Sequence, residues 1–308
     1  MTLQIKENIV LAPFTTFKIG GAAKYFVDVH SDEDLREALA WAHEKNIRPM
    51  ILAGGSNVLV ADTGFDGLVI HIRSDTFSFA GVELGADAGC DLLTLIRAAS
   101  ERGLGGWEQL AGIPGTIGGA VRGNAGAFGT EIKNFAHTIR ALNKDTGEIR
   151  EFNTAECTFS YRQSFFKNHP EWIITHVFIG LLKVNTTESN KHIEETIAER
   201  EKRHLQNVQA AGSYFMNPKT PQYVQELFES EKKMKSREGR VPAGWLIEKA
   251  GMKGAVIGGA QASEQHPNYI VNIGNATSED VRKLAFEIKI AVHTQYGVTL
   301  QEEAAFVE

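Results

Sequence analysis

The pattern of polar and apolar residues predicts a strand followed directly by a helix near the start of the chain. Residues 23–29 alternate, which is typical of a strand. Ser31 is a good N-cap for the helix, and the three acidic residues after it favour the positive end of the helix dipole. The apolar stripe of this helix is Leu35, Ala38, Leu39 and Ala42. Residues 49–52 and 68–72 read as two further strands, with a glycine cluster between them.

The middle of the chain predicts another strand and helix, followed by short strands. Residues 82–86 read as a strand, and residues 91–102 as a helix that ends at Gly103. The inward positions of that helix are Leu92, Leu95, Ile96 and Ala99. Residues 139–142 and 148–152 flank a turn sequence and predict a hairpin. The polar segment 185–190 is the best candidate linker, and a charged helix should follow it to about residue 204.

The last third predicts three helices and a closing strand. One helix should start near Pro221 and a short one after Pro242. A long helix should run from Ser278 to a C-cap at Gly297, and residues 298–303 should form the last strand. The inward positions expected here are Val224, Leu227 and Phe228 in the first helix, and Val281, Leu284, Ile288, Ala291 and Val292 in the long one.

Composition indicates a globular protein of two or three domains. The chain has 308 residues, of which 43% are hydrophobic and 23% charged. A net charge of −6 argues against a general nucleic-acid binder. Cys90 and Cys157 are far apart and in no metal-like spacing, so neither a disulfide framework nor a metal site is expected. With no apolar run that could cross a bilayer, we expect a cytoplasmic protein without a membrane partner.

Two glycine clusters, residues 52–60 and 112–129, carry the main chemical signal. Consecutive glycines expose backbone N–H groups that can cradle a diphosphate, and Ser56 and Asn57 can add side-chain donors. Neither cluster fits the dinucleotide-binding fingerprint or the P-loop. Residues 54–57 alone are equally compatible with an ordinary turn. Together, the two clusters could hold one extended ligand.

Seven blocks of sequence resemble the UDP-N-acetylenolpyruvoylglucosamine reductases (UDP-N-acetylmuramate dehydrogenases). They are residues 15–21, 53–60, 111–119, 124–129, 161–166, 212–218 and 243–248, in the order of that family. The resemblance implies an α+β fold with a two-part FAD-binding domain of the vanillyl-alcohol-oxidase-like type. We expect its parts at residues 1–75 and 76–190, followed by a C-terminal α+β substrate domain at 191–308. The last strand could return towards the FAD-binding domain.

The resemblance also implies an activity, cofactors and a cofactor site. The expected reaction is NADPH-dependent, FAD-mediated reduction of the enolpyruvyl ether of UDP-N-acetylglucosamine to UDP-N-acetylmuramate, a cytoplasmic step of peptidoglycan synthesis. The short spacing between Arg162 and Ser213 resembles the branch of the family without a tyrosine loop over the substrate. The expected cofactor-binding residues are Gly54, Gly55, Ser56, Asn57, Gly112, Pro114, Gly115, Thr116, Gly118, Gly119, Asn124 and Gly126. The oligomeric state stays open.

Reduction of an enolpyruvyl group requires a cation, an acid near the carboxylate and a proton donor, because hydride addition pushes negative charge onto the carboxylate. The resemblance assigns these roles to Arg162, Glu303 and Ser213. An isolated arginine in a β segment is otherwise usually a surface residue, and a Gly-Ser pair is usually a turn. Glu302 and Glu303 should face opposite ways in a strand, and burial would have to keep Glu303 protonated.

Three further residues match substrate-binding positions of the family: Tyr161, Asn217 and His266. The sequence departs from the family pattern at residues 203–209, which lack its prolines, at Gly123 and at Met216, which replaces a frequent basic residue. Two alternatives stay open, namely another FAD-dependent oxidoreductase of the same fold and a flavin or nucleotide-sugar binding protein without turnover.

Overall fold

The computed structural model describes residues 3–203 and 208–308. The chain forms two compact units, each built from separate stretches of sequence. Unit 1 comprises Met1–Ile9, Ala23–Gly54 and Asp66–Lys202, and unit 2 comprises Val10–Ala22, Gly55–Phe65 and Arg203–Glu308. The predicted end of a helix near residue 204 lies outside the described residues.

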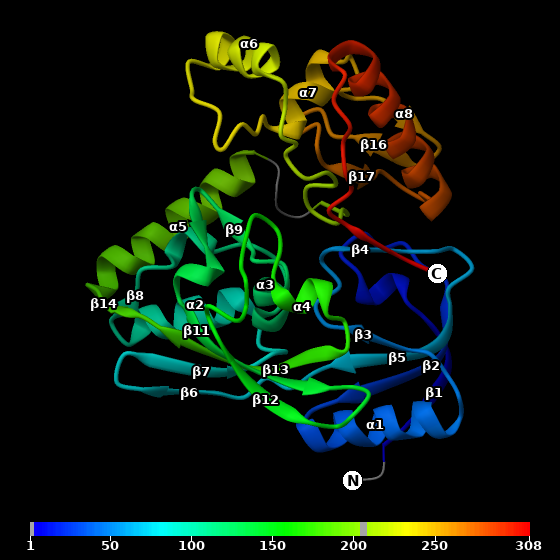
Figure 1. Cartoon of the computed structure of the whole chain (residues 1–308), viewed down its shortest axis with the longest axis vertical. Helices are drawn as coiled ribbons and strands as arrows, with labels where there is room; N and C mark the ends of the chain where they lie inside the picture. The colour runs from blue at the N-terminus through cyan, green and yellow to red at the C-terminus, as the bar shows by residue number, and fades with distance from the viewer. Residues whose placement is uncertain (1–2, 204–207) are drawn as a thin grey trace. The chain divides into compact units, whose positions relative to one another are not determined.

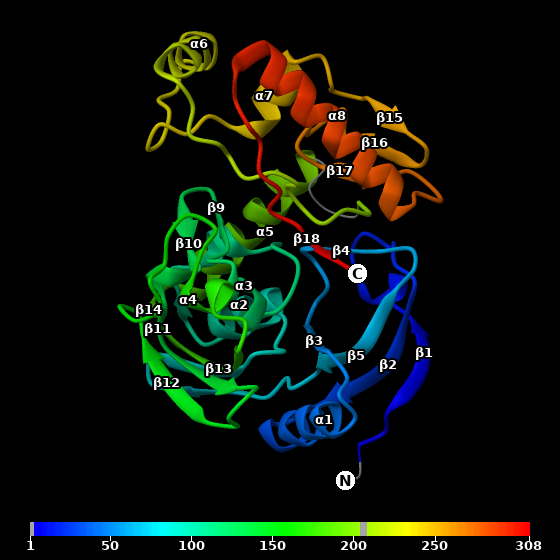
Figure 2. The same cartoon turned by 45° about the vertical axis from the view of Figure 1, so that its right-hand side comes forward.

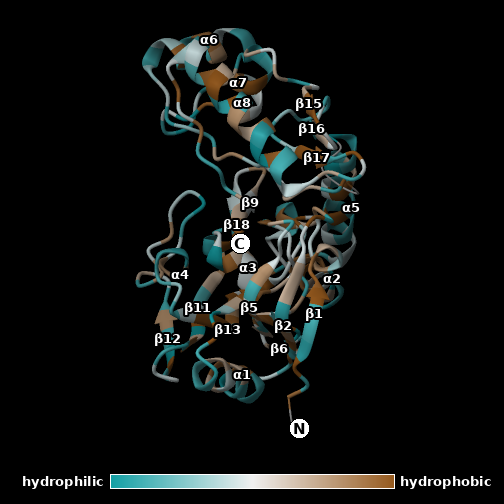
Figure 3. Ribbon diagram, turned by 90° about the vertical axis from the view of Figure 1, so that its right-hand side faces the viewer, coloured by the Kyte–Doolittle hydropathy of each residue, from teal (hydrophilic) through white to brown (hydrophobic). Residues whose placement is uncertain are grey.

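The first sheet of unit 1 has four strands in the order β1-β2-β5-β3, with β3 parallel to β5 (Figure 1). Their bounds are Lys6–Val10 (β1), Ala22–Val29 (β2), Phe65–Ile72 (β5) and Pro49–Leu52 (β3). Helix α1, Asp32–Glu44, begins as predicted, because the Ser31 hydroxyl accepts a hydrogen bond from the Asp34 N–H at 3.1 Å. Its four predicted inward residues are all buried, and its outer side is hydrophilic (Figure 3).

The second sheet of unit 1 is antiparallel, with five strands in the order β12-β11-β13-β7-β6. Their bounds are Ile149–Asn153 (β12), Ala136–Asn143 (β11), Trp172–Gly180 (β13), Glu83–Asp87 (β7) and Phe77–Ala80 (β6). The predicted hairpin is confirmed, since Leu142 lies opposite Ile149. The Asn143 side chain accepts hydrogen bonds from two N–H groups of the turn, and Gly147 takes a left-handed φ of 73°.

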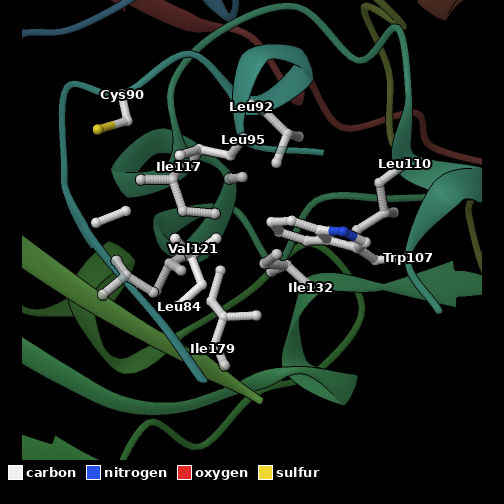
Figure 4. Packing of buried hydrophobic residues seen from close by; sticks show 14 of the residues in the cluster. Leu84, Cys90, Leu92, Leu95, Trp107, Leu110, Ile117, Val121, Ile132 and Ile179 are labelled. Carbon is white, nitrogen blue, oxygen red and sulfur yellow. The ribbon is translucent and has the colours of Figure 1, made fainter. Parts of the chain in front are cut away.

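Helices α2 (Leu92–Glu101) and α3 (Ile117–Arg122) share with this sheet an apolar cluster that includes Trp107 (Figure 4). The predicted inward residues of α2 are buried, and Asp91 caps the helix. Glycine at position 103 follows the end of α2 with φ 69°, as expected. The remaining short elements of unit 1 are β8 (Leu104–Gly105), η2 (Glu108–Leu110), β9 (Gly126–Ala127), β10 (Thr130–Glu131), η3 (Ile132–Asn134), α4 (Phe165–Asn168) and β14 (Leu182–Lys183).

The expected linker at residues 185–190 is wrong, because this segment begins helix α5, Thr186–Lys202. The Asn185 side chain accepts hydrogen bonds from the N–H groups of Thr187 and Glu188 and so caps the helix. Further along, Ser189 donates to buried Glu108 at 2.6 Å, and Asn190 accepts from Ser100 at 2.8 Å. Polar residues that resemble a linker in sequence therefore attach α5 to η2 and α2.

Unit 2 contains a three-stranded sheet in the order β15-β16-β17, with helix α8 packed against it (Figures 1 and 2). Its elements are η1 (Ala12–Phe14), β4 (Val58–Val60), α6 (Gln222–Lys232), α7 (Ala243–Lys249), β15 (Val256–Ile257), β16 (Ala260–Ala262), β17 (Ile270–Asn272), α8 (Ser278–Tyr296) and β18 (Ala305–Val307). The predicted start of α8 and its C-cap at Gly297 are confirmed. The Asp62 carboxylate accepts hydrogen bonds from the N–H and hydroxyl of Ser278, at 3.0 and 2.7 Å.

Two expectations for unit 2 are wrong. Leu227 is 51% exposed, because α6 packs through Val224 and Phe228, and Leu227 is rotated by about 100° from Phe228 on a helix of 3.6 residues per turn. The last strand lies at Ala305–Val307 instead of residues 298–303, and it pairs in parallel with β4. Residues 298–304 make single backbone contacts to other segments, such as the bridge between Glu302 and Phe215, instead of a continuous ladder.

Neither a membrane-spanning helix nor a metal cluster is found in residues 3–203 and 208–308. No helix in these ranges has the length and apolar character needed to cross a bilayer. No group of three His, Cys, Asp or Glu side chains in the same ranges could hold a metal ion.

A buried histidine makes the stability of unit 1 depend on pH. His71 of β5 is hydrogen-bonded through Nδ1 to Asp28 of β2 at 2.8 Å. Burial lowers the pKa of His71 below its ordinary value of 6.5, although Asp28 opposes the shift. The unfolded chain therefore takes up a proton near pH 6.5, while folded His71 remains neutral to a lower pH. Folding stability must fall as the pH drops through this region.

We predict that His71→Gln removes part of this pH dependence. Glutamine can still hydrogen-bond Asp28 but does not titrate, so the free energy of unfolding should fall less between pH 7.5 and 5.5 than in the wild type. Urea unfolding at several pH values measures the difference, with the exposed His43→Gln as the control. If the free energy of unfolding of the His71 variant fell with pH as steeply as that of the wild type, the prediction would be contradicted.

Candidate functional site

The second glycine cluster forms the start of α3 in unit 1. Gly115 has φ 114°, and the Thr116 hydroxyl caps the helix by accepting from the Gly119 N–H at 3.3 Å. The N–H of Gly118 donates to the Ala88 carbonyl at 3.0 Å, and a Cβ on Gly118 would lie 2.7 Å from the Ala88 Cβ. Gly118 is thus required by close packing inside the protein. A Cβ on Gly119 would meet no heavy atom closer than 3.5 Å, so this glycine borders open space.

The first glycine cluster approaches the second at one point inside unit 1. A Cβ built on Gly54 would lie 2.8 Å from the Gly115 Cα and 3.4 Å from the Thr116 nitrogen. Real Cβ atoms essentially never approach a backbone atom under 3.0 Å. Two backbones therefore meet here with no room for a side chain between them.

The rest of the first cluster belongs to unit 2 and leaves backbone donors available. Gly55 has φ 60°, and a Cβ there would collide with the Phe14 carbonyl at 2.0 Å. The N–H groups of residues 54–57 have no hydrogen-bond acceptor among the residues that the structure describes. Four consecutive free donors beside glycines fit an anionic group such as the diphosphate of FAD.

Asn57 connects this loop to the C-terminal segment. Its side-chain Nδ2 donates to the carbonyl of Glu303 at 3.3 Å, and its own carbonyl accepts from the Ala305 N–H at 3.0 Å. The second contact leads into the parallel pairing of β18 with β4. A predicted cofactor loop and a predicted catalytic acid are therefore hydrogen-bonded neighbours.

Ser213 lies on the backbone segment next to Glu303. Gly212 precedes it with φ 72°, and the N–H of Glu303 donates to the Tyr214 carbonyl at 2.8 Å. On the other side, the buried Asn268 side chain accepts from the Phe215 N–H at 3.0 Å and donates to the Phe215 carbonyl at 2.8 Å. Asn268 was not identified from the sequence, where no local pattern distinguishes it from other loop asparagines.

The two adjacent glutamates differ in exposure and in their contacts. Glu302 is 40% exposed and forms an ion pair with Lys289 of α8 at 2.9 Å. Glu303 is half-buried, and its peptide group is bonded to Asn57 and Tyr214 on its two sides. Glu303 is the member of the pair whose N–H is hydrogen-bonded to Tyr214, the residue after Ser213.

Arg162 occupies a strained backbone position in unit 1. It has φ 57°, a left-handed conformation that is uncommon outside glycine, and its Nη2 donates to the Gly126 carbonyl at 3.3 Å. Its guanidinium lies 5.9 Å from the centre of the Tyr161 ring. Gly126 itself has no space for a side chain, because a Cβ there would lie 2.8 Å from Glu131 Cγ. Arg162, Tyr161, Gly126 and Asn124 therefore form one group of predicted site residues.

Asn217 and His266 gather at the start of α7 in unit 2. The Asn217 Oδ1 accepts from the Ala243 N–H at 2.9 Å, and the Asn217 carbonyl accepts from Arg240 Nη1 at 2.8 Å. The His266 ring packs edge-on against Tyr269 at 4.9 Å. Asn217 thus borders the first turn of α7, and His266 lies near it, because a Cβ built on Gly244 would be 3.9 Å from His266 Cε1.

The two cysteines belong neither to the group around Arg162 nor to the pair formed by Asn217 and His266. Both are buried, and burial raises the pKa of each thiol, Cys90 and Cys157, to about 12. They remain protonated and unreactive at neutral pH.

Comparison with known proteins places this geometry in a family. The C-terminal domain model of UDP-N-acetylenolpyruvoylglucosamine reductase matches residues 203–307, and an FAD-binding domain model matches residues 23–153. The reductase of Solibacter usitatus is 36% identical over 99% of this chain and 97% of its own. The chain belongs to the UDP-N-acetylenolpyruvoylglucosamine reductase family. It is a flavin-dependent oxidoreductase, and the resemblance seen in the sequence is confirmed.

Two further relatives agree with this assignment. The reductase of Caldicellulosiruptor bescii is 37% identical over 99% of this chain and 91% of its own. The crystal structure of the reductase from Thermus caldophilus superposes with a TM-score of 0.80 at 28% identity and covers 99% of this chain and 100% of that one. The expected α+β fold class with an FAD-binding domain is confirmed.

We predict that Gly54→Ala weakens FAD binding by about tenfold or more. The added methyl must push Gly115 away, and overpacking of this kind costs roughly 1–3 kcal/mol, where 1.4 kcal/mol is a factor of ten. The flavin-to-protein absorbance ratio after titration with FAD measures the loss.

Gly123→Ala is the matched control for this experiment, because a Cβ at Gly123 would meet only the Gly119 carbonyl, at 3.6 Å. It should bind FAD as the wild type does. Equal FAD affinity in the Gly54 and Gly123 variants would show that the close approach of the two loops is unimportant for the cofactor.

Proposed function

We propose that this protein uses NADPH, through bound FAD, to reduce the enolpyruvyl ether of UDP-N-acetylglucosamine to UDP-N-acetylmuramate in cytoplasmic peptidoglycan synthesis. The observation that carries the proposal is the peptide group of Glu303. It is hydrogen-bonded to Asn57 of the first glycine cluster on one side and to Tyr214, the neighbour of Ser213, on the other. Hydrogen bonds through Glu303 thus join the segments of unit 2 that carry the proposed cofactor loop, proton donor and acid.

In this proposal the FAD-binding parts are residues 1–75 and 76–190, and residues 191–308 form the substrate domain. The free N–H groups of residues 54–57 would hold the diphosphate, and Gly119 would border the cofactor at its open side. FAD held there would supply the hydride-transfer chemistry between NADPH and the substrate. The other predicted cofactor residues, Gly112, Pro114, Gly115, Thr116 and Gly118, shape the loop around it.

Arg162 would bind the enolpyruvyl carboxylate. A guanidinium can grip a carboxylate with two parallel hydrogen bonds and stays charged throughout the reaction. Its hydrogen bond to the Gly126 carbonyl and its position over Tyr161 restrict the directions that the side chain can take. This cation would stabilise the negative charge that reaches the carboxylate as the β-carbon is reduced.

Ser213 and Glu303 would complete the reaction. The α-carbon of the enolate-like intermediate is basic enough to take the proton of the Ser213 hydroxyl, which has no hydrogen-bond partner of its own among the described residues. The protonated carboxyl of Glu303 would donate a hydrogen bond to the developing dianionic carboxylate. Tyr161, Asn217 and His266 would contact the rest of the UDP-sugar.

We predict that Ser213→Ala separates the two halves of the catalytic cycle. Under anaerobic conditions NADPH should bleach the flavin at the wild-type rate, because that step needs no proton from Ser213. Reoxidation by the enolpyruvyl substrate should slow by about 10²–10⁴-fold, the usual contribution of a general acid. Stopped-flow absorbance measures both rates, and a wild-type reoxidation rate would remove Ser213 from its role.

We predict that Glu303→Ala lowers kcat by about 10²-fold, the typical loss on removing one donor to a developing anion. Glu303→Gln should retain more activity than Glu303→Ala, because its amide can still donate. Glu302→Ala is the matched control, since its side chain forms only an exposed ion pair, and its kcat should stay near the wild-type value. Similar losses in the two alanine variants would contradict the assignment.

A further inference from the structure

A buried asparagine in unit 1 lies between the two segments that hold Arg162. Asn124 is 1% exposed, and its side chain makes three hydrogen bonds. All three partners belong to the protein. The amide therefore has protein partners at both of its ends.

The first of these bonds fixes the turn that carries Arg162. Asn124 Nδ2 donates to the Ser160 carbonyl at 2.8 Å. Ser160 and Gln163 exchange two backbone hydrogen bonds of 3.1 Å each, which close a tight turn around Tyr161 and Arg162. Arg162 is held in its left-handed conformation at the tip of this turn. The position of the arginine backbone therefore depends on where Asn124 places Ser160.

The second and third bonds fix the hairpin that receives the guanidinium. Asn124 Nδ2 also donates to Glu131 Oε2 at 3.0 Å, and Oδ1 accepts from the Lys133 N–H at 3.3 Å. Glu131 lies opposite Gly126 in the β9–β10 pair, and the Gly126 carbonyl accepts from Arg162 Nη2 at 3.3 Å. One amide therefore fixes the turn that carries the Arg162 backbone and the β9–β10 pair whose Gly126 carbonyl accepts a hydrogen bond from the Arg162 side chain.

Asparagine suits this place for two physical reasons. Its φ of 42° is in the left-handed region, which asparagine tolerates better than most residues with a side chain. Its amide also donates and accepts at once, whereas aspartate would lose both donated bonds and place a second carboxylate beside Glu131. A buried polar group with all its partners fixed is also a rigid one.

We propose that Asn124 is a positioning residue that orients Arg162 towards the substrate carboxylate. The proposal rests on the proposed function, in which Arg162 binds that carboxylate. Removal of the amide should slow the transfer to the enolpyruvyl substrate by about 10–100-fold, because small displacements of a catalytic group can cost 10²-fold in rate. FAD affinity and the rate of flavin reduction by NADPH should not change.

The experiment uses the FAD-loaded full chain and four variants, namely Asn124→Gly, Arg162→Lys, Arg162→Ala and the double variant of the first two. Glycine keeps the left-handed backbone without strain and removes only the amide. FAD affinity, flavin reduction by NADPH and reoxidation by the enolpyruvyl substrate are measured for each. We expect normal values for the first two in Asn124→Gly and a slow third step. The double variant should reoxidise no more slowly than Arg162→Lys, because the amide acts through the arginine.

Asn143→Gly is the matched control for a general loss of stability. Asn143 is also a mostly buried asparagine of unit 1, and its amide organises the β11–β12 turn. It should weaken folding without changing reoxidation. Asn124→Asp provides a second test if Asn124→Gly is poorly folded, because it keeps a side chain of the same shape. With Glu131→Gln added, the new amide can donate a hydrogen bond to the aspartate, in the reverse direction of the lost bond, and part of the lost rate should return.

The outcomes separate this inference from the proposed function. Normal reoxidation in Arg162→Lys and in Arg162→Ala would overturn the role of Arg162 itself. A slow Arg162→Lys with a normal Asn124→Gly would overturn only the positioning role. Loss of FAD affinity in Asn124→Gly would identify Asn124 as a cofactor contact, and multiplicative losses in the double variant would show that the two residues act independently. Each of these last two results contradicts the inference.

Discussion

The proposed chemistry of unit 2 depends on the backbone pairing of residues 301–307 with two segments that are remote in sequence. The N–H of Glu303 is bonded to Tyr214, its carbonyl to Asn57, and β18 continues the contact along β4. The bond to Tyr214 and the β18–β4 pairing are main-chain hydrogen bonds, which fix distance and direction, whereas Asn57 contributes its side-chain amide. Ser213 and Glu303, the proposed proton donor and acid, thereby lie on neighbouring hydrogen-bonded segments of backbone.

In unit 1, the predicted site residues are positioned differently. Two of them have unusual backbone conformations that buried hydrogen bonds hold in place. Arg162 and Asn124 both have left-handed φ values, of 57° and 42°. Each such residue costs roughly 1–3 kcal/mol and persists only where its surroundings determine it. The buried amide of Asn124 and the double hydrogen bond between Ser160 and Gln163 provide those surroundings. Strain of this kind is typical of functional sites.

Local signals in the sequence were sufficient for elements whose caps and apolar stripes lie close together in the chain. Helix α1 with Ser31, α2 with Asp91, and α8 with Gly297 all follow from such signals. The segment at 185–190 was misread because its polar side chains find their partners in α2 and η2, about 80–90 residues away in sequence.

The site shows the same division between local and remote information. The glycine clusters and the identities of Arg162, Ser213 and Glu303 are visible as ordered motifs. The sequence does not show that Gly118 is needed for packing on Ala88 whereas Gly119 borders open space. The role of the Asn268 amide could not be predicted from the sequence either, because its hydrogen bonds join segments 53 residues apart. Such roles become evident only when the remote partner is known.

The discontinuous composition of unit 2 limits how this protein can be taken apart. A fragment that begins at residue 203 would lack β4, so β18 would be an unpaired edge, and α8 would lose the carboxylate of Asp62 at its first turn. The matched C-terminal region is therefore not a self-contained module that recombination could graft onto another cofactor domain. The N-terminal part of the sequence supplies residues 10–22 and 55–65 of unit 2, so a cut at residue 203 divides this unit.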